Sequence, residues 1–97
     1  AATTAGPSAP APKGRPDPAA RRQQLAPLRK ELKQVERELD ALERRKGELA
    51  ATLADPGTFA DTTTARSAGR ELGEVERRLA RLEERWVELG DAIDALV

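Results

Sequence analysis

The chain has 97 residues, with 17 basic and 17 acidic side chains, so its formal net charge is zero. Of its 37 hydrophobic residues 18 are alanine, which leaves 19 large apolar side chains, and only Phe59 and Trp86 among them are aromatic. So few large apolar side chains exclude a thick two-layer core, although they suffice for a narrow apolar seam between helices.

Missing residue types exclude several kinds of chemistry. The chain has no cysteine and no histidine, so it cannot build disulfides, the common zinc sites, a histidine base or a cysteine nucleophile. It also lacks the glycine-rich motifs that bind phosphates. Neighbouring carboxylates such as Glu83 and Glu84 fall on the exterior of a predicted helix, where they are solvated. We therefore predict that this chain is not an enzyme and holds no cofactor or metal.

The sequence also carries no sign of membrane targeting. No segment approaches the ~20 apolar residues that span a bilayer, and the first residues do not resemble a signal peptide. Methionine is absent, position 1 included. These features predict an excised domain of a larger cytoplasmic protein, or a processed product.

Residues 1–18 contain five of the seven prolines, together with small and polar residues. Proline interrupts regular hydrogen bonding, and the stretch has no large apolar side chain to bury. We predict a flexible, disordered linker here, with a cloning remnant as the alternative.

Two apolar runs with alternating spacings of three and four follow the linker. The first comprises Leu25, Leu28, Leu32, Val35, Leu39, Leu42, Lys46, Leu49 and Leu53, in which only Lys46 is not apolar. The second comprises Ala65, Ala68, Leu72, Val75, Leu79, Leu82, Trp86, Leu89, Ile93 and Leu96. A seam that recurs every 3.5 residues is typical of a coiled coil. The predicted fold is all-α: a monomeric two-helix antiparallel coiled-coil hairpin over residues 19–97.

Proline and glycine place the helix ends. Pro27 is tolerated at a helix start, so we expect helix 1 over about residues 27–54, with a kinked extra turn over 19–26. Pro56 and Gly57 end it within a turn at 55–61. Helix 2 then covers about residues 62–95, capped by Asp61 or by one of the threonines at 62–64.

The register of the two helices can be derived from the residue numbers, because the numbers of paired residues in an antiparallel hairpin add up to a constant. A sum of 121 gives apolar layers with one exception, the layer of Lys46 and Val75. Its layers include Leu53 with Ala68, Leu49 with Leu72, Leu42 with Leu79, Val35 with Trp86 and Leu32 with Leu89. A sum of 114 leaves Ile93 and Leu96 without partners, so we favour 121.

Basic residues form three groups that could contact nucleic-acid phosphates. Candidates for such contact are Arg21, Arg22, Arg29, Lys30 and Lys33 at the open end of the hairpin, Arg44 and Arg45 halfway along helix 1, and Arg77, Arg78 and Arg81 on helix 2. In the 121 register Arg44 stands opposite Arg77, so these groups would share one belt. The alternative is a salt-bridged flank of the coiled coil, since glutamates occur at the same level. Residues 21–54 carry nine basic and six acidic residues, so helix 1 is the expected phosphate-facing side.

The two aromatic residues allow further interpretations. Phe59, in the turn, either packs over the last layer near Leu53 or is offered to a partner. Trp86 lies on the seam, where we expect it to fill the core instead of stacking on a base.

Residues 21–95 resemble the C-terminal domain of ABC-F proteins, the soluble twin-cassette ATPases that act on ribosomes. The matching features are L-A-P-L-R-K at residues 25–30, the heptads after it, the turn L-A-D-P-G-T-F-A-D at 53–61, and E-E-R-W-V-E-L at 83–89. The linker before them is similar to the one that usually follows the second cassette in this family.

The resemblance implies a non-catalytic domain that helps its parent ATPase to bind DNA or ribosomal RNA in translation. ATP and magnesium would be bound by the parent's cassettes and by no residue of this chain. The C-terminal tRNA arm of valyl-tRNA synthetase is a similar hairpin, but it tends to carry K-A-P after the turn aromatic, whereas A-D-T-T-T follows Phe59 here. A purely structural coiled coil remains the alternative from another functional class.

Overall fold

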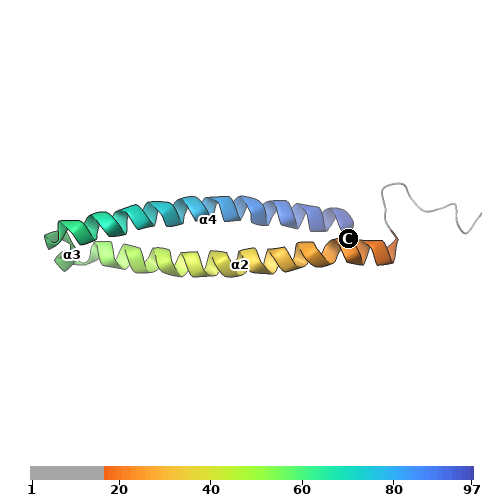
Figure 1. The fold of residues 1–97 in the computed structure, drawn as a ribbon, viewed down its shortest axis with the longest axis horizontal. Coiled ribbons are helices and arrows are strands. Elements are labelled where there is room, and N and C mark those ends of the chain that lie inside the picture. The colour runs from red at the N-terminus through yellow and green to blue at the C-terminus, as the bar shows by residue number, and fades with distance from the viewer. Residues whose placement is uncertain (1–16) are drawn as a thin grey trace, which may run out of the picture.

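The protein is an antiparallel hairpin of two long helices. The computed structural model describes residues 17–97, apart from the side chain of Phe59, so residues 1–16 of the linker predicted over 1–18 lie outside the described residues. Helix α2 (Pro18–Ala54), the one-turn helix α3 (Pro56–Ala60) and helix α4 (Thr62–Leu96) follow one another, and this part of the chain has no strand. Figure 1 shows α2 and α4 side by side, α3 at the closed end and the C-terminus at the open end. The predicted fold class is confirmed.

Helix α2 begins at Pro18, so the extra turn expected over residues 19–26 is present and is continuous with the helix expected from Pro27. Asp17 is its N-cap, since the side-chain Oδ1 accepts a hydrogen bond of 2.8 Å from the Ala20 amide, and Pro18 occupies the first turn, where its missing N–H costs nothing. Leu25, two turns further on, is buried in the seam, so packing stabilises this end of the helix. The assignment of residue 18 to the linker was wrong, because Asp-Pro is itself a helix-start signal.

Two aspartates cap the helices at the closed end. Asp55 ends α2 and begins α3, with its Oδ1 accepting a hydrogen bond of 2.9 Å from the Gly57 amide. Asp61 begins α4, where its carboxylate accepts bonds from the Thr64 hydroxyl at 2.7 Å and from the amides of Thr63 and Thr64 at 3.1 and 3.3 Å. The segment expected to be a turn at 55–61 therefore contains a turn of helix between two caps.

The core is a stripe that follows the predicted seam. Every buried apolar side chain of the described residues lies at a position that the heptad pattern predicted: Leu25, Val35, Leu49, Ala68, Val75, Leu79 and Leu89. Leu89 is the most deeply buried, with 1% of its surface exposed. These residues are distributed along both helices, so neither helix can bury its apolar stripe without the other.

One buried cluster distinguishes the two registers. It unites Leu49, Ala68, Val75 and Leu79, and Leu39, Leu42, Leu53 and Leu72 pack against it. In the register with sum 121 these side chains come from consecutive layers, which include Leu53 with Ala68 and Leu42 with Leu79. With sum 114, Leu53 would lie beyond the seam of α4 and Val35 would join Leu79. Val35 is buried but is not part of this cluster, so the structure has the register with sum 121.

Lys46 is the one charged side chain in the predicted seam, and it is half-buried. Its layer partner Val75 is buried, with 7% of its surface exposed. A polar residue at one seam position of a coiled coil lowers stability while it restricts the register. The same layer is therefore the weakest point of the core and the point where an apolar residue would gain most.

We predict that Lys46→Leu raises the free energy of unfolding by about 1–2 kcal/mol, because the new side chain packs against Val75. Thermal unfolding followed by circular dichroism at several protein concentrations measures the change. Arg44→Leu is the matched control, since it removes the same charge from an exposed position and should change stability by less than about 0.5 kcal/mol. Equal effects of the two substitutions would contradict the seam assignment.

Candidate nucleic-acid interface

A row of basic side chains occupies the side of α2 opposite its seam. Lys30, Arg37 and Arg44 recur every seven residues, which corresponds to two helical turns or about 10.5 Å, and Lys33 lies between the first two. Lys30, Lys33 and Arg37 line a shallow groove together with Gln34. All four basic residues are exposed, and none of them forms a salt bridge within residues 17–97. We call Lys30, Lys33, Arg37 and Arg44 the α2 basic face.

Arg37 was not among the residues predicted for this interface. It was missed because the prediction grouped basic residues that are neighbours in the sequence. The seven-residue spacing from Lys30 to Arg37 to Arg44 would have identified it, since residues seven apart lie on one side of a helix. The periodicity that located the apolar seam thus also locates the basic face.

Arg22 and Arg29 extend the exposed basic surface towards the open end of the hairpin. Arg21 differs from them because it is half-buried, four residues before Leu25 on the line of the seam. Of the predicted open-end group, Arg22, Arg29, Lys30 and Lys33 are exposed to a partner, whereas Arg21 is partly withdrawn.

A regular set of ion pairs joins the two helices along one flank of the seam. Glu31 pairs with Arg85, Glu38 with Arg78 and Arg45 with Glu71. The members on each helix are seven residues apart, and the residue numbers of every pair add up to 116. We call these six residues the ion-paired flank.

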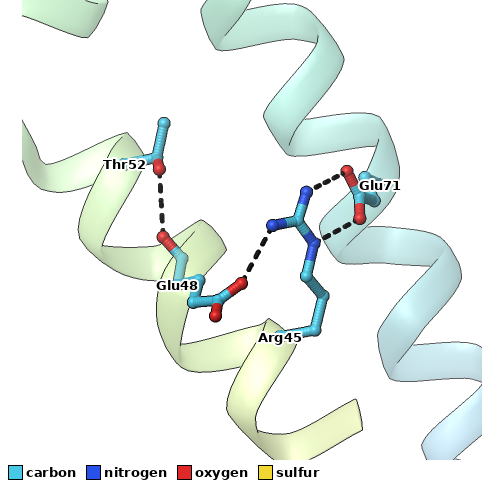
Figure 2. Close-up of polar contacts among 4 residues, drawn as sticks. All are labelled: Arg45, Glu48, Thr52 and Glu71. Carbon is cyan, nitrogen blue, oxygen red and sulfur yellow. Dashed lines mark hydrogen bonds and ion pairs between the residues drawn. The ribbon is translucent and has the colours of Figure 1, made fainter. Parts of the chain in front are cut away.

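The Arg45 guanidinium illustrates the geometry of this flank. Its Nε and Nη2 donate to the two carboxylate oxygens of Glu71 at 2.5 and 2.7 Å, and its Nη1 donates to Glu48 at 3.0 Å (Figure 2). Arg85 repeats the arrangement two heptads away, with bonds of 2.6 and 2.8 Å to Glu31 and of 3.2 Å to Glu88. Such forked contacts hold both side chains in one orientation. The middle pair is looser, with 3.8 Å between Arg78 Nη2 and Glu38 Oε2.

The forked pairs shift the pKa values of their members. The hydrogen bonds from Arg85 lower the pKa of Glu31 below its ordinary value, and those from Arg45 do the same to the pKa of Glu71. The pKa values of the two arginines rise for the same reason.

Arg45 and Arg78, both predicted as phosphate contacts, belong to the ion-paired flank. Salt bridging, the alternative considered for them, is what the structure shows.

The predicted belt of Arg44 and Arg77 does not form one surface. The register places the two residues at the same height, but each lies on the outer side of its own helix, so they face opposite directions. The Arg77 guanidinium lies beside Gly73 on α4. A Cβ atom added at position 73 would lie 3.5 Å from Arg77 Nη1. Arg81 lines a groove with Glu71 and Glu74, where the charge is mixed.

Trp86 is 44% exposed and does not fill the core as expected. Its indole N–H donates a hydrogen bond of 3.2 Å to Glu36, on the flank opposite the ion pairs. Its layer partner Val35 is buried, with 5% of its surface exposed, and the seam between two helices is too narrow to enclose an indole ring as well. The position of the Phe59 side chain lies outside the described residues, whereas Thr58 beside it is buried in the short helix.

Comparison with known families assigns this hairpin. The sequence model of the ABC transporter C-terminal domain family matches residues 27–91, about two thirds of the chain. The chain belongs to this family. It is a C-terminal, non-catalytic domain of an ABC protein, which agrees with the resemblance identified from the turn and the heptads. The matched segment contains the α2 basic face and the whole ion-paired flank of this ABC C-terminal domain.

No curated protein sequence and no solved structure matches the chain. Among residues 17–97, no helix of the ABC C-terminal domain has both the length and the hydrophobicity needed to cross a membrane.

We predict that the ion-paired flank makes stability depend on pH in the acid range. Because the pKa values of Glu31 and Glu71 are lower in the folded state, their pairs stabilise the fold above the unfolded-state value of about 4.3. This contribution is lost as the pH falls through the folded-state values. Glu31→Gln with Glu71→Gln should therefore lower Tm at pH 7, and the difference from the parent should shrink as the pH is lowered from 7 to 3.

Glu76→Gln with Glu84→Gln is the control, because both carboxylates are exposed and neither forms a salt bridge in the described part of the chain. This variant should not lose stability at pH 7. A parent-to-variant difference for Glu31 and Glu71 that is the same at pH 3 and pH 7 would contradict the assignment.

Proposed function

We propose that this domain binds nucleic acid through the α2 basic face, without sequence preference, on behalf of a parent ATPase of the ABC-F type. The observation that carries the proposal is the free state of these four basic residues. Arg45, Arg78 and Arg85 are engaged by glutamates, whereas Lys30, Lys33, Arg37 and Arg44 form no ion pair within residues 17–97. Basic side chains that are not paired with a carboxylate of the same chain are available to bind phosphates and so to release the counterions of a nucleic acid.

The dimensions of the face suit a phosphate backbone. Lys30 and Arg44 are 14 residues apart, which corresponds to about 21 Å along the helix, or about six base pairs of duplex at 3.4 Å each. Lysine offers a point charge and arginine a planar fork, and both bind phosphate oxygens. Gln34 is the one side-chain amide in the groove, so the face offers little for reading bases.

The parent protein would supply the catalytic activity. ATP and magnesium would be bound by the parent's cassettes, and the domain would contribute contact with DNA or with ribosomal RNA during translation in the cytoplasm. The zero net charge of the chain gives little long-range attraction, so affinity must come from the local cluster. We expect a dissociation constant of about 10⁻⁴–10⁻⁶ M that rises steeply with salt.

We predict that Lys30→Glu, Lys33→Glu and Arg37→Glu together abolish binding to duplex DNA and to structured RNA. Four phosphate contacts give a slope of about −3 to −4 for the logarithm of the binding constant against that of the salt concentration. Fluorescence anisotropy with labelled duplexes of two unrelated sequences measures affinity and slope, and circular dichroism checks that helix content is unchanged.

Arg66→Glu, Arg70→Glu and Arg77→Glu form the matched control. This variant has the same change in net charge, but its substitutions lie on exposed positions of α4. It should keep most of the affinity. If both variants bind as the parent chain does, or if both lose binding equally, the α2 basic face is not the interface. In the first case the structural coiled coil becomes the better explanation.

A further inference from the structure

The outer side of α4 has an apolar groove surrounded by carboxylates. Ala80 and Val87 form its apolar part, and Glu83, Glu84 and Glu88 surround them. Val87 is 52% exposed and, with Trp86 and Val97, is one of the large apolar side chains that the hairpin leaves on its surface. We call these five residues the α4 acidic groove. It lies on the opposite helix from the α2 basic face.

The negative charge of this groove is only partly neutralised within the described residues. Glu83 and Glu84 form no salt bridge there, and Glu88 shares Arg85 with Glu31. Residues 80–97 contain two basic residues, Arg81 and Arg85, and five acidic ones: Glu83, Glu84, Glu88, Asp91 and Asp94. The groove therefore combines an apolar surface with a field that attracts cations and repels nucleic acid.

Carboxylates of the two helices also lie at similar heights along the neighbouring flank of the seam. In the observed register Glu83 lies at nearly the same height as Glu36, and Glu76 at nearly the same height as Glu43, on the flank opposite the ion pairs. Like charges that lie close together on a helix surface are destabilising. A cationic partner that docks beside the groove would remove this cost, as the ion pairs do on the other flank. Trp86, held by Glu36, lies at the same place and adds apolar surface.

The groove requires an occupant with both an apolar and a basic part. A second copy of the chain does not meet this requirement, because the residues that line the groove of its α2 basic face are Lys30, Lys33, Gln34 and Arg37, with no large apolar side chain among them. A basic amphipathic helix does, since an apolar stripe can cover Val87 and Ala80 while flanking lysines or arginines meet the glutamates.

We propose that the α4 acidic groove is a docking site for a basic amphipathic helix of a partner protein. This inference does not depend on nucleic-acid binding, because the two faces lie on different helices and attract opposite charges. Docking there would leave the α2 basic face accessible, so one hairpin could bind a protein and a nucleic acid together.

A synthetic helical peptide with a leucine stripe flanked by lysines, and without tryptophan, serves as the probe. We expect its addition to the 97-residue chain to shift Trp86 fluorescence to shorter wavelength, because Trp86 is the only tryptophan and is half-exposed beside the groove. In nitrogen-15 spectra the shifted amides should cluster at residues 80–91. Peptides with glutamate in place of lysine, or with serine in place of leucine, should bind at least tenfold more weakly.

Glu83→Gln with Glu84→Gln should weaken binding of the lysine-leucine peptide about fivefold to tenfold. Adding Val87→Ser to these two should reduce it further. Asp40→Asn with Glu74→Gln is the control, since it removes two exposed carboxylates outside the groove and should leave the affinity unchanged. Circular dichroism of each variant verifies folding.

Three results would overturn the proposal. Equal weakening by both pairs of substitutions would show that only net charge matters. Undiminished binding of the serine peptide would show that the apolar surface has no role. Concentration-dependent self-association of the chain that requires Val87 would assign the groove to a second copy of the domain.

Discussion

Each long helix of this domain has only one apolar stripe, and it can bury that stripe only against the other helix. All buried apolar residues of the described chain lie on this shared seam. The pairing of the helices therefore determines which surface residues lie beside the seam and which lie opposite it. It also determines which residues of α2 and α4 lie at the same level along the hairpin. Because no second layer covers the hairpin, the remaining faces differ from one another mainly in charge.

The surfaces around the seam have different charge arrangements. One flank carries ion pairs in three successive heptads, whereas the other carries Trp86 hydrogen-bonded to Glu36 and no ion pair between the helices among the described residues. Away from the seam, α2 is basic and α4 becomes acidic towards its end. The small net charge of residues 17–97, which carry 15 basic and 17 acidic side chains, thus conceals opposite faces and is a poor guide to what either face attracts.

Heptad spacing was sufficient to predict the hairpin, its register and the seam, because burial in a two-helix coiled coil follows the sequence period directly. Charge was harder to interpret. Arg45 and Arg78 were grouped with sequence neighbours, although Arg45 and Glu71 meet only through the docked register. Trp86 was expected in the core because spacing says nothing about whether a ring fits beside Val35. The start of α2 was left between residues 19 and 27 because Pro27 suggested a boundary, although the Asp17 cap precedes it.

Substitution of an ion-paired basic residue and of an unpaired one should affect this domain differently. An arginine of the ion-paired flank contributes to holding the helices in register, so its replacement acts on the fold, although only modestly at an exposed position. A lysine of the α2 basic face has no such partner among the described residues and can be replaced without altering the seam. Stability and charge on the outer faces are therefore nearly separable here. A hairpin of this kind can acquire or lose a partner by substitutions at a few heptad positions while its two helices stay paired as before.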